Sequence, residues 1–227
     1  MNTLCREIAQ MIDHSLLRPD LTDREIEREC GAAKRYNVAS VCCRPCDVKR
    51  ASELLSGSQV AVGAVVGFPH GSHKTSTKVF ETQEALADGA KEIDMVLNIG
   101  KLKSGDHEYV KKDIQAVVDV SHVGGAIVKV ILENYYLTDE EKQTACRLCE
   151  EAGADFVKTS TGFAGGGATI EDLVLMRKSV SSKIQVKAAG GVRDLDMALK
   201  VKKAGATRFG ATRTAEILDD CRKKEGE

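Results

Sequence analysis

The stretch A-D-F-V-K-T-S-T-G, from Ala154 to Gly162, decides the fold and the chemistry that this chain can support. Its apolar start is typical of a buried strand, and its small polar residues and closing glycine are typical of a loop. It carries one lysine, Lys158, among apolar neighbours. A buried ammonium costs free energy unless it is paired or loses its proton. Lys158 is therefore either one half of a buried ion pair or an amine kept neutral as a nucleophile.

The rest of the chain alternates short apolar strands with longer amphipathic helices. Two helix starts read T-x-x-E, the pattern of a capping box, at Thr22 and at Thr138. Three steps of the form A-G-A or D-G-A place a glycine after a helix and just before a strand. We predict eight strands, over residues 11–17, 39–43, 60–68, 92–97, 126–133, 156–159, 184–188 and 207–210.

Eight strand–helix units in one chain predict the fold class α/β, as a single TIM (β/α)8 barrel with parallel strands. The chain has 227 residues, an ordinary size for such a barrel, and no Pro- or Ser-rich linker divides it. We therefore expect one barrel domain over residues 1–227. The alternative is an open doubly wound sheet, but no G-x-G-x-x-G fingerprint follows the first predicted strand.

The composition narrows the class of function. The chain has 33 basic and 34 acidic residues and a formal net charge of −1, so it lacks the basic excess of a nucleic-acid binder. No apolar run is long enough to span a bilayer, and the first residues lack the pattern of a secretory signal. We expect no nucleic-acid partner, no membrane partner and a cytoplasmic location.

Strand parity gathers charged residues on one face. Successive side chains of a strand point to opposite faces, and in a barrel the fully apolar face should lie under the helices. The mixed face then points inward and carries Asp94, Lys129, Lys158 and Lys187. Burial and a neighbouring ammonium both lower the pKa of a lysine, which favours a neutral nucleophile, and a carboxylate could transfer protons. On periodicity alone, Schiff-base chemistry and a buried ion pair fit this cluster equally well.

Two glycine loops favour the catalytic interpretation. A-A-G-G-V-R-D follows the seventh predicted strand and opens a helix, so we expect free backbone N–H groups to form an anion site there. F-G-A-T-R follows the last strand, and loops in these two positions often bind phosphate in TIM barrels. The residues that we expect to form the anion site are Gly190, Gly191, Gly210, Thr212 and Arg213.

Six motifs resemble those of the deoxyribose-phosphate aldolases, class I aldolases built on a TIM barrel. They are I-D-H-S-L-L-R-P-D-L-T, V-G-F-P-H-G, E-I-D-M-V-L-N-I-G, V-K-V-I-L-E, F-V-K-T-S-T-G-F and V-K-A-A-G-G-V-R, and the resemblance runs from Ile12 to about Thr212. It implies reversible cleavage of 2-deoxy-D-ribose 5-phosphate to D-glyceraldehyde 3-phosphate and acetaldehyde through a lysine Schiff base, in deoxyribonucleoside and deoxyribose phosphate catabolism. It implies no metal and no cofactor, phosphorylated sugar and aldehyde substrates and, by analogy, a homodimer.

The resemblance also implies roles for individual residues. Lys158 would form the Schiff base, while Asp94 and Lys187 would form the proton relay and Lys187 would help to lower the pKa of the amine. Substrate-binding positions would be Asp13, Ser15, Lys129 and Thr161. Phosphate-binding positions would be Gly162, Gly190, Gly191, Gly210 and Thr212, with Arg213 as a further candidate. The chain departs from the family's usual pattern at Ser15, where threonine is common, and over residues 212–214, where small serines and a glycine are usual.

Two other classes of function are alternatives. His70 and His73 form H-x-x-H, a spacing that can bind a metal, so a metal-dependent lyase is one of them. Four of the eight cysteines form two C-x-x-C pairs, which also occur in zinc-binding and thiol-reactive proteins. The non-functional interpretation of the two histidines is that they are polar loop residues.

The cysteines are expected to serve packing more than chemistry. Cys146 and Cys149 fall on the apolar face of a predicted helix, where free cysteine behaves as a small hydrophobic residue. Cys43 and Cys46 lie at the exit of the second predicted strand. We expect one of them to react with thiol reagents or reactive aldehydes, and we expect the pair to bind no metal. A disulfide scaffold is not expected, because such chains are short, rich in loops and extracellular.

Overall fold

All eight predicted strands are present, and each bound lies within two residues of the predicted one. The computed structural model of the chain describes residues 3–226. The strands are β1 (Ile12–Leu16), β2 (Ser40–Cys43), β3 (Ala61–Val66), β4 (Glu92–Val96), β5 (Ile127–Ile131), β6 (Phe156–Lys158), β7 (Gln185–Ala188) and β8 (Arg208–Ala211).

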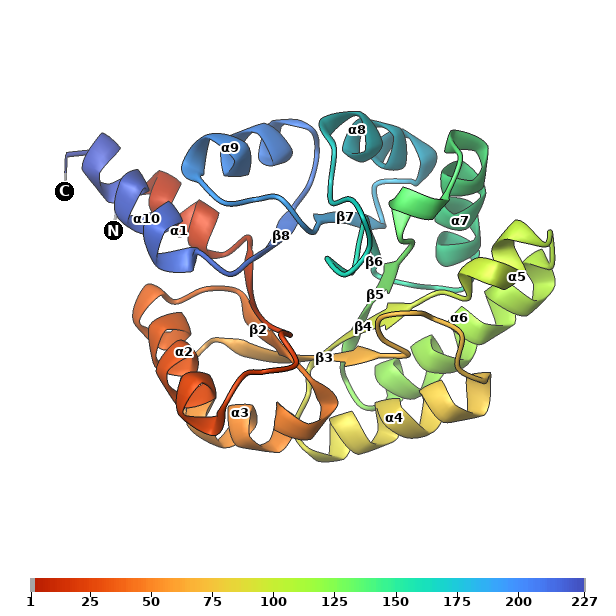
Figure 1. Cartoon of the computed structure of the whole chain (residues 1–227), viewed down its shortest axis with the longest axis horizontal. Helices are drawn as coiled ribbons and strands as arrows, with labels where there is room; N and C mark the ends of the chain where they lie inside the picture. The colour runs from red at the N-terminus through yellow and green to blue at the C-terminus, as the bar shows by residue number, and fades with distance from the viewer. Residues whose placement is uncertain (1–2, 227) are drawn as a thin grey trace.

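The strands pair in the order of the sequence, all of them parallel, and β8 closes the sheet on β1 (Figure 1). Ile12 lies beside Phe209 and Asp13 beside Gly210 across this closing pair. Because the sheet has no open edge, the expectation of a closed TIM barrel is confirmed and the open doubly wound alternative is excluded.

Helices surround the barrel and connect consecutive strands (Figure 1). Both predicted capping boxes are present, at Thr22 and Thr138, and each fixes the first turn of its helix. The helices are α1 (Thr3–Ala9), α2 (Asp23–Tyr36), α3 (Val48–Leu55), α4 (Thr75–Ala87), α5 (Ile99–Lys103), α6 (His107–Val123), α7 (Asp139–Glu151), α8 (Ile170–Ser179), α9 (Leu195–Lys203) and α10 (Thr214–Lys224), with short 3-10 turns η1 (Pro45–Asp47) and η2 (Asn134–Tyr136). No helix within residues 3–226 is both long and apolar enough to cross a bilayer.

The apolar core lies between the sheet and the helices, as strand parity predicts. On β5, Val128 and Val130 belong to this core, while Lys129 between them points into the barrel and is fully buried. The same alternation puts Asp94 inside and Met95 outside on β4. The barrel interior is therefore the place where the charged residues meet.

Helices α1 and α10 lie side by side and bring the two ends of the described chain together (Figure 1). A disulfide between Cys5 and Cys221 joins them. The sequence did not predict this pair, because 216 residues separate the two cysteines and neither belongs to a recognisable pattern.

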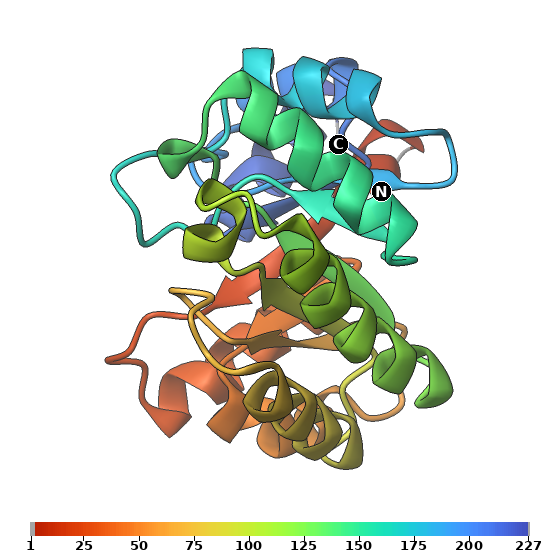
Figure 2. The ribbon, with the colours of Figure 1, turned by 90° about the vertical axis from the view of Figure 1, so that its right-hand side faces the viewer.

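The loops that follow the strands project from one end of the barrel. Figure 2 shows the β1–α2 loop (17–22) and the β6–α8 loop (159–169) extending from the same side of the molecule. In a TIM barrel the loops after the strands form the face that carries the functional site.

Candidate active site

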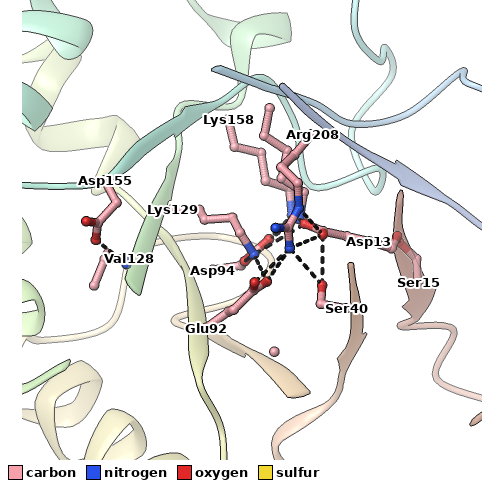
Figure 3. A network of polar contacts seen from close by, with 12 residues as sticks. Asp13, Ser15, Ser40, Glu92, Asp94, Val128, Lys129, Asp155, Lys158 and Arg208 are labelled. Atoms are coloured by element: carbon pink, nitrogen blue, oxygen red, sulfur yellow. Dashed lines mark hydrogen bonds and ion pairs between the residues drawn. The ribbon is translucent and has the colours of Figure 1, made fainter. Parts of the chain in front are cut away.

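The barrel interior holds a network of buried charges (Figure 3). Figure 3 shows three carboxylates turned toward the tips of basic side chains that come from other strands. Within residues 3–226 the network contains four basic residues and three acidic ones, Lys129, Lys158, Lys187, Arg208, Asp13, Glu92 and Asp94.

Asp94 is the centre of this network and contacts all three lysines. Its Oδ1 accepts a hydrogen bond from Lys129 Nζ at 2.9 Å. Its Oδ2 accepts from Lys158 Nζ at 2.7 Å and from Lys187 Nζ at 2.6 Å. Burial alone would raise the pKa of this carboxyl, but the three ammonium groups outweigh burial and hold the pKa well below its usual range.

Asp13 is a second carboxylate of the network and shares Lys129 and Lys187 with Asp94. Its Oδ1 accepts from Ser40 Oγ at 2.8 Å and from Arg208 Nε at 2.7 Å. Its Oδ2 pairs with Lys187 and lies 3.2 Å from Lys129 Nζ. Lys187 is thus held between two carboxylates, which fixes the position of its ammonium group beside Lys158.

The pKa values of the three lysines in the network are shifted in different directions. Burial acts to lower the pKa of each, but the carboxylates around Lys129 and Lys187 outweigh it and raise their pKa values. Within residues 3–226, Lys158 pairs only with Asp94, and both its burial and the charge of Lys187 act against its protonated form, so its pKa is lowered. With four basic groups against three carboxylates, a neutral Lys158 would also balance the charge of the network.

Lys158 opens onto a cavity of about 330 Å³ at the loop end of the barrel. The residues that line this cavity come from the ends of strands β1, β6 and β8 and from the loops that follow β1, β6, β7 and β8. They are Ser15, Leu17, Arg18, Lys158, Thr161, Gly162, Phe163, Ala189, Gly190, Gly191, Val192, Arg193, Gly210, Ala211 and Thr212.

Most of the residues predicted for the site reach this cavity or lie directly behind it. Ser15, Lys158, Thr161, Gly162, Gly190, Gly191, Gly210 and Thr212 line it. Asp13, Asp94, Lys129 and Lys187 are completely or almost completely buried behind Lys158 and shape its charge environment. Arg213 is exposed and does not line the cavity, because the chain turns into α10 at this residue.

Residues with unpaired backbone amides line the same cavity as Lys158. Within the described residues, the N–H groups of Gly162, Gly191 and Val192 donate to no acceptor. Gly191 has a φ of 94°, so the chain bends here without entering a helix. The A-A-G-G-V-R-D stretch opens a helix as expected, because its last residue, Asp194, caps α9. Gly190 and Gly191, however, lie before the helix N-terminus, since α9 begins only at Leu195. The candidate anion site therefore consists of loop amides.

Two arginines that the sequence analysis did not select also line the cavity. Arg193 follows the unpaired amides, and Arg18 belongs to the β1–α2 loop. Arg44 holds that loop in place, since its guanidinium donates to the carbonyl oxygens of Arg18, Pro19 and Leu21 at 2.8–3.2 Å. Loop arginines carry no strand parity, so the pattern of the sequence could not place them.

Glu92 and Arg208 were also missed, although parity carried a signal for both. Glu92 lies two residues before Asp94 and therefore on the same face of β4. Arg208 Nη2 donates to both carboxylate oxygens of Glu92, at 2.7 and 2.8 Å, which ties β8 to β4 across the barrel.

The structure also locates the residues of the alternative hypotheses. His70 and His73 are exposed, and residues 3–226 contain no group of three or more His, Cys, Asp or Glu side chains placed to hold a metal ion. Cys146 and Cys149 are buried in α7, as expected from their apolar face. Cys43 is buried and Cys46 is exposed, so the predicted thiol reactivity falls on Cys46.

Comparisons with known proteins agree with this geometry. The family model described as DeoC/LacD family aldolase matches residues 7–218. Deoxyribose-phosphate aldolase 1 of Bacillus licheniformis is 54% identical over 95% of this chain and 96% of its own, and the deoxyribose-phosphate aldolase of Thermococcus gammatolerans is 52% identical over 96% and 98%. A tetrameric deoxyribose phosphate aldolase from Aeropyrum pernix superposes with a TM-score of 0.90 at 28% identity, covering 97% of this chain and 93% of that one. The chain therefore belongs to the DeoC/LacD aldolase family.

Proposed function

We propose that this protein is a lyase that reversibly cleaves 2-deoxy-D-ribose 5-phosphate to D-glyceraldehyde 3-phosphate and acetaldehyde through a Schiff base on Lys158. One observation carries the proposal. Lys158 is a buried amine with a lowered pKa, and it opens onto a cavity that is also lined by residues with unpaired amides and by two arginines. A neutral amine and an anion site in one cavity fit a phosphorylated aldehyde. The relatives that are 52–54% identical are named for this activity.

The first step joins the substrate to the enzyme. Neutral Lys158 Nζ attacks the C1 aldehyde of the open-chain sugar, and loss of water from the carbinolamine leaves an iminium ion. Asp94 Oδ2 contacts both Lys158 Nζ and Lys187 Nζ, so protons can pass between the amine, the carboxylate and the second ammonium. Lys187 and Asp94 are the residues that we assign to this relay.

The second step breaks the bond between C2 and C3. A base removes the proton of the C3 hydroxyl, the electron pair of the C2–C3 bond moves toward the iminium nitrogen, and glyceraldehyde 3-phosphate leaves. Protonation of the resulting enamine at C2 and addition of water then release acetaldehyde and restore Lys158. The positive charges around Lys158 disfavour the positively charged iminium ion, so they favour its conversion to the neutral enamine.

The phosphate group is assigned to the unpaired amides and the arginines that line the cavity. The amides of Gly162, Gly191 and Val192, with the side chains of Arg18 and Arg193, would hold it there. A charged phosphorylated sugar does not cross a bilayer unaided, which supports a cytoplasmic location. The tetrameric relative from Aeropyrum pernix supports an oligomer, and a homodimer is the smallest assembly that we propose.

Borohydride trapping tests the proposed chemistry. Acetaldehyde with borohydride should add a two-carbon group to Lys158, found by peptide mass spectrometry, and should abolish turnover, while EDTA should leave turnover unchanged. A wild-type protein without an adduct at Lys158 would rule out the Schiff base. Loss of activity in EDTA would favour a metal-dependent lyase instead.

The phosphate assignment is tested separately with two arginine variants. Arg193→Ala should raise the KM for 2-deoxyribose 5-phosphate by about tenfold and leave the reaction of unphosphorylated 2-deoxyribose nearly unchanged. Arg213→Ser is the matched control, because this exposed residue does not line the cavity. An equal effect of the two substitutions would refute the assignment.

A further inference from the structure

Glu133 is a buried carboxylate to which the proposed reaction gives no role. The residue is 2% exposed, and within residues 3–226 its carboxylate contacts Thr161 and forms no ion pair. Its backbone is left-handed, with a φ of 58° and a ψ of 65°, a conformation that glutamate seldom adopts. A buried charge and a left-handed backbone both cost free energy, so the surrounding structure must hold them in place.

The left-handed turn lies where the end of β5 is bonded to the strand of the reactive lysine. The Leu132 N–H donates to the Lys158 carbonyl at 2.9 Å, and the Asn134 N–H donates to the Thr159 carbonyl at 3.0 Å. Glu133 sits between these two hydrogen bonds. These bonds therefore fix the backbone position from which the Glu133 side chain extends, beside the loop that follows Lys158.

The Glu133 carboxylate is hydrogen-bonded to this loop at Thr161. The Thr161 N–H donates to the two carboxylate oxygens at 3.3 and 3.2 Å, and the Thr161 hydroxyl donates to Oε2 of the same group. The hydroxyl also accepts the N–H of Phe163 at 3.0 Å. Gly162 is thereby held from both sides, while its own N–H has no acceptor within the described residues and the glycine lines the cavity.

We propose that Glu133 is a positioning residue that fixes the turn over residues 161–163, so that the Gly162 amide is presented to the phosphate of the substrate. This inference rests on the proposed function and adds a residue that touches no reacting atom. The Thr161 hydroxyl has already donated its hydrogen to Glu133, so Thr161 links Glu133 to Gly162 and cannot donate the same hydrogen to the sugar. The expected substrate-binding role of Thr161 becomes, in this proposal, a structural link in the phosphate site.

Two substitutions of Glu133 distinguish the effect of its side-chain length from the effect of its charge. Glu133→Gln keeps the length and an acceptor, whereas Glu133→Asn suits a left-handed backbone but is one methylene too short. Thr161→Ser keeps the hydroxyl and Thr161→Val removes it. We expect Glu133→Asn and Thr161→Val to raise the KM for 2-deoxyribose 5-phosphate by about tenfold, and the two conservative variants to stay within about threefold. The value of kcat should change less than KM.

Two further measurements distinguish positioning from a general effect on folding. Calorimetry should show that inorganic phosphate binds about tenfold more weakly to Glu133→Asn, and that adding Thr161→Val weakens it little further, because both changes break one link. Borohydride trapping with acetaldehyde, which carries no phosphate, should proceed at the wild-type rate.

Specific results would overturn the proposal. If Glu133→Asn slows acetaldehyde trapping as much as it weakens phosphate binding, or if phosphate binds equally to all variants, Glu133 does not position Gly162. Calorimetry needs no turnover, so it tests Glu133 even if the proposed reaction fails. A wild-type protein that binds phosphate but forms no adduct would refute the Schiff base alone.

Discussion

Two regions of this molecule bury a lysine against an aspartate, and only one of them is suited to chemistry. In the barrel, Lys158 Nζ contacts Asp94 at 2.7 Å. Between α4 and α6, Lys78 Nζ contacts Asp113 at 2.5 Å and donates to the Val96 carbonyl at 2.9 Å. The pKa of Lys78 is lowered mainly by burial, just as the pKa of Lys158 is.

The difference lies in the neighbours and in access. Lys158 shares one oxygen of Asp94 with the ammonium of Lys187 and lines a cavity. Asp113 instead accepts hydrogen bonds from Lys78 and from the hydroxyl of Thr75. The Lys78 side chain is 0% exposed, so no aldehyde can reach its amine. A lowered pKa alone does not make a lysine a nucleophile. A second ammonium and an open cavity distinguish Lys158, the proposed nucleophile, from Lys78.

The largest expected effect comes from removing the amine of Lys158. Lys158→Met should lower kcat/KM by about a thousandfold or more, because within residues 3–226 no other lysine lines the cavity where the imine is proposed to form. The melting temperature should change little, because Asp94 keeps its ion pairs with Lys129 and Lys187. Steady-state kinetics and calorimetric melting measure the two effects. Retained turnover would contradict the assignment of Lys158.

Lys78→Met should show the opposite pattern. It leaves Asp113 buried without its cation, which should destabilise the fold by about 3–5 kcal/mol in urea unfolding. The folded fraction should still form the acetaldehyde adduct at Lys158, because Lys78 takes no part in the site. A variant of normal stability that has lost the adduct would reverse the roles of the two lysines.

Lys187→Met tests why the pKa of Lys158 is lowered. The ammonium of Lys187 disfavours the protonated form of Lys158, so its removal should raise the pKa of Lys158 toward the ordinary value. The neutral fraction grows as pH rises through this pKa, so the acid limb of borohydride trapping should move to higher pH, with trapping several-fold slower at neutral pH. Lys183→Met, at an exposed lysine, is the control. An unmoved limb would mean that burial alone lowers the pKa.

The contrast also shows which features the sequence could predict. Strand positions follow from local apolar runs, and parity then places Asp94, Lys129, Lys158 and Lys187 on one interior face, because a strand has a fixed period of two. The reactive region is therefore predictable from its own short segments. A resemblance to a family adds the reaction, and the comparisons bear that family out.

Other features depend on how distant segments meet, and no local pattern reports them. Lys78 and Asp113 are 35 residues apart on two different helices, and Cys5 and Cys221 are 216 residues apart. Glu133 was visible at the end of a predicted strand, but its contact with Thr161 depends on a left-handed turn that glutamate rarely takes. Arg18 and Arg193 lie in loops, whose directions are set by packing.

The smallest expected effect is that of replacing the whole Lys78–Asp113 pair. Removing one partner leaves an uncompensated buried charge, whereas Lys78→Met with Asp113→Leu removes both charges and fills a similar volume. The double variant should therefore recover most of the stability lost in Lys78→Met and come within about 1–2 kcal/mol of the wild type in urea unfolding. A double variant as unstable as the single one would show that Thr75 and the Val96 carbonyl, both left without their partners, hold α4 in place. Recovery would show that this pair is replaceable by apolar packing, whereas Lys158 and Asp94 cannot be replaced in this way without loss of the amine that the reaction needs.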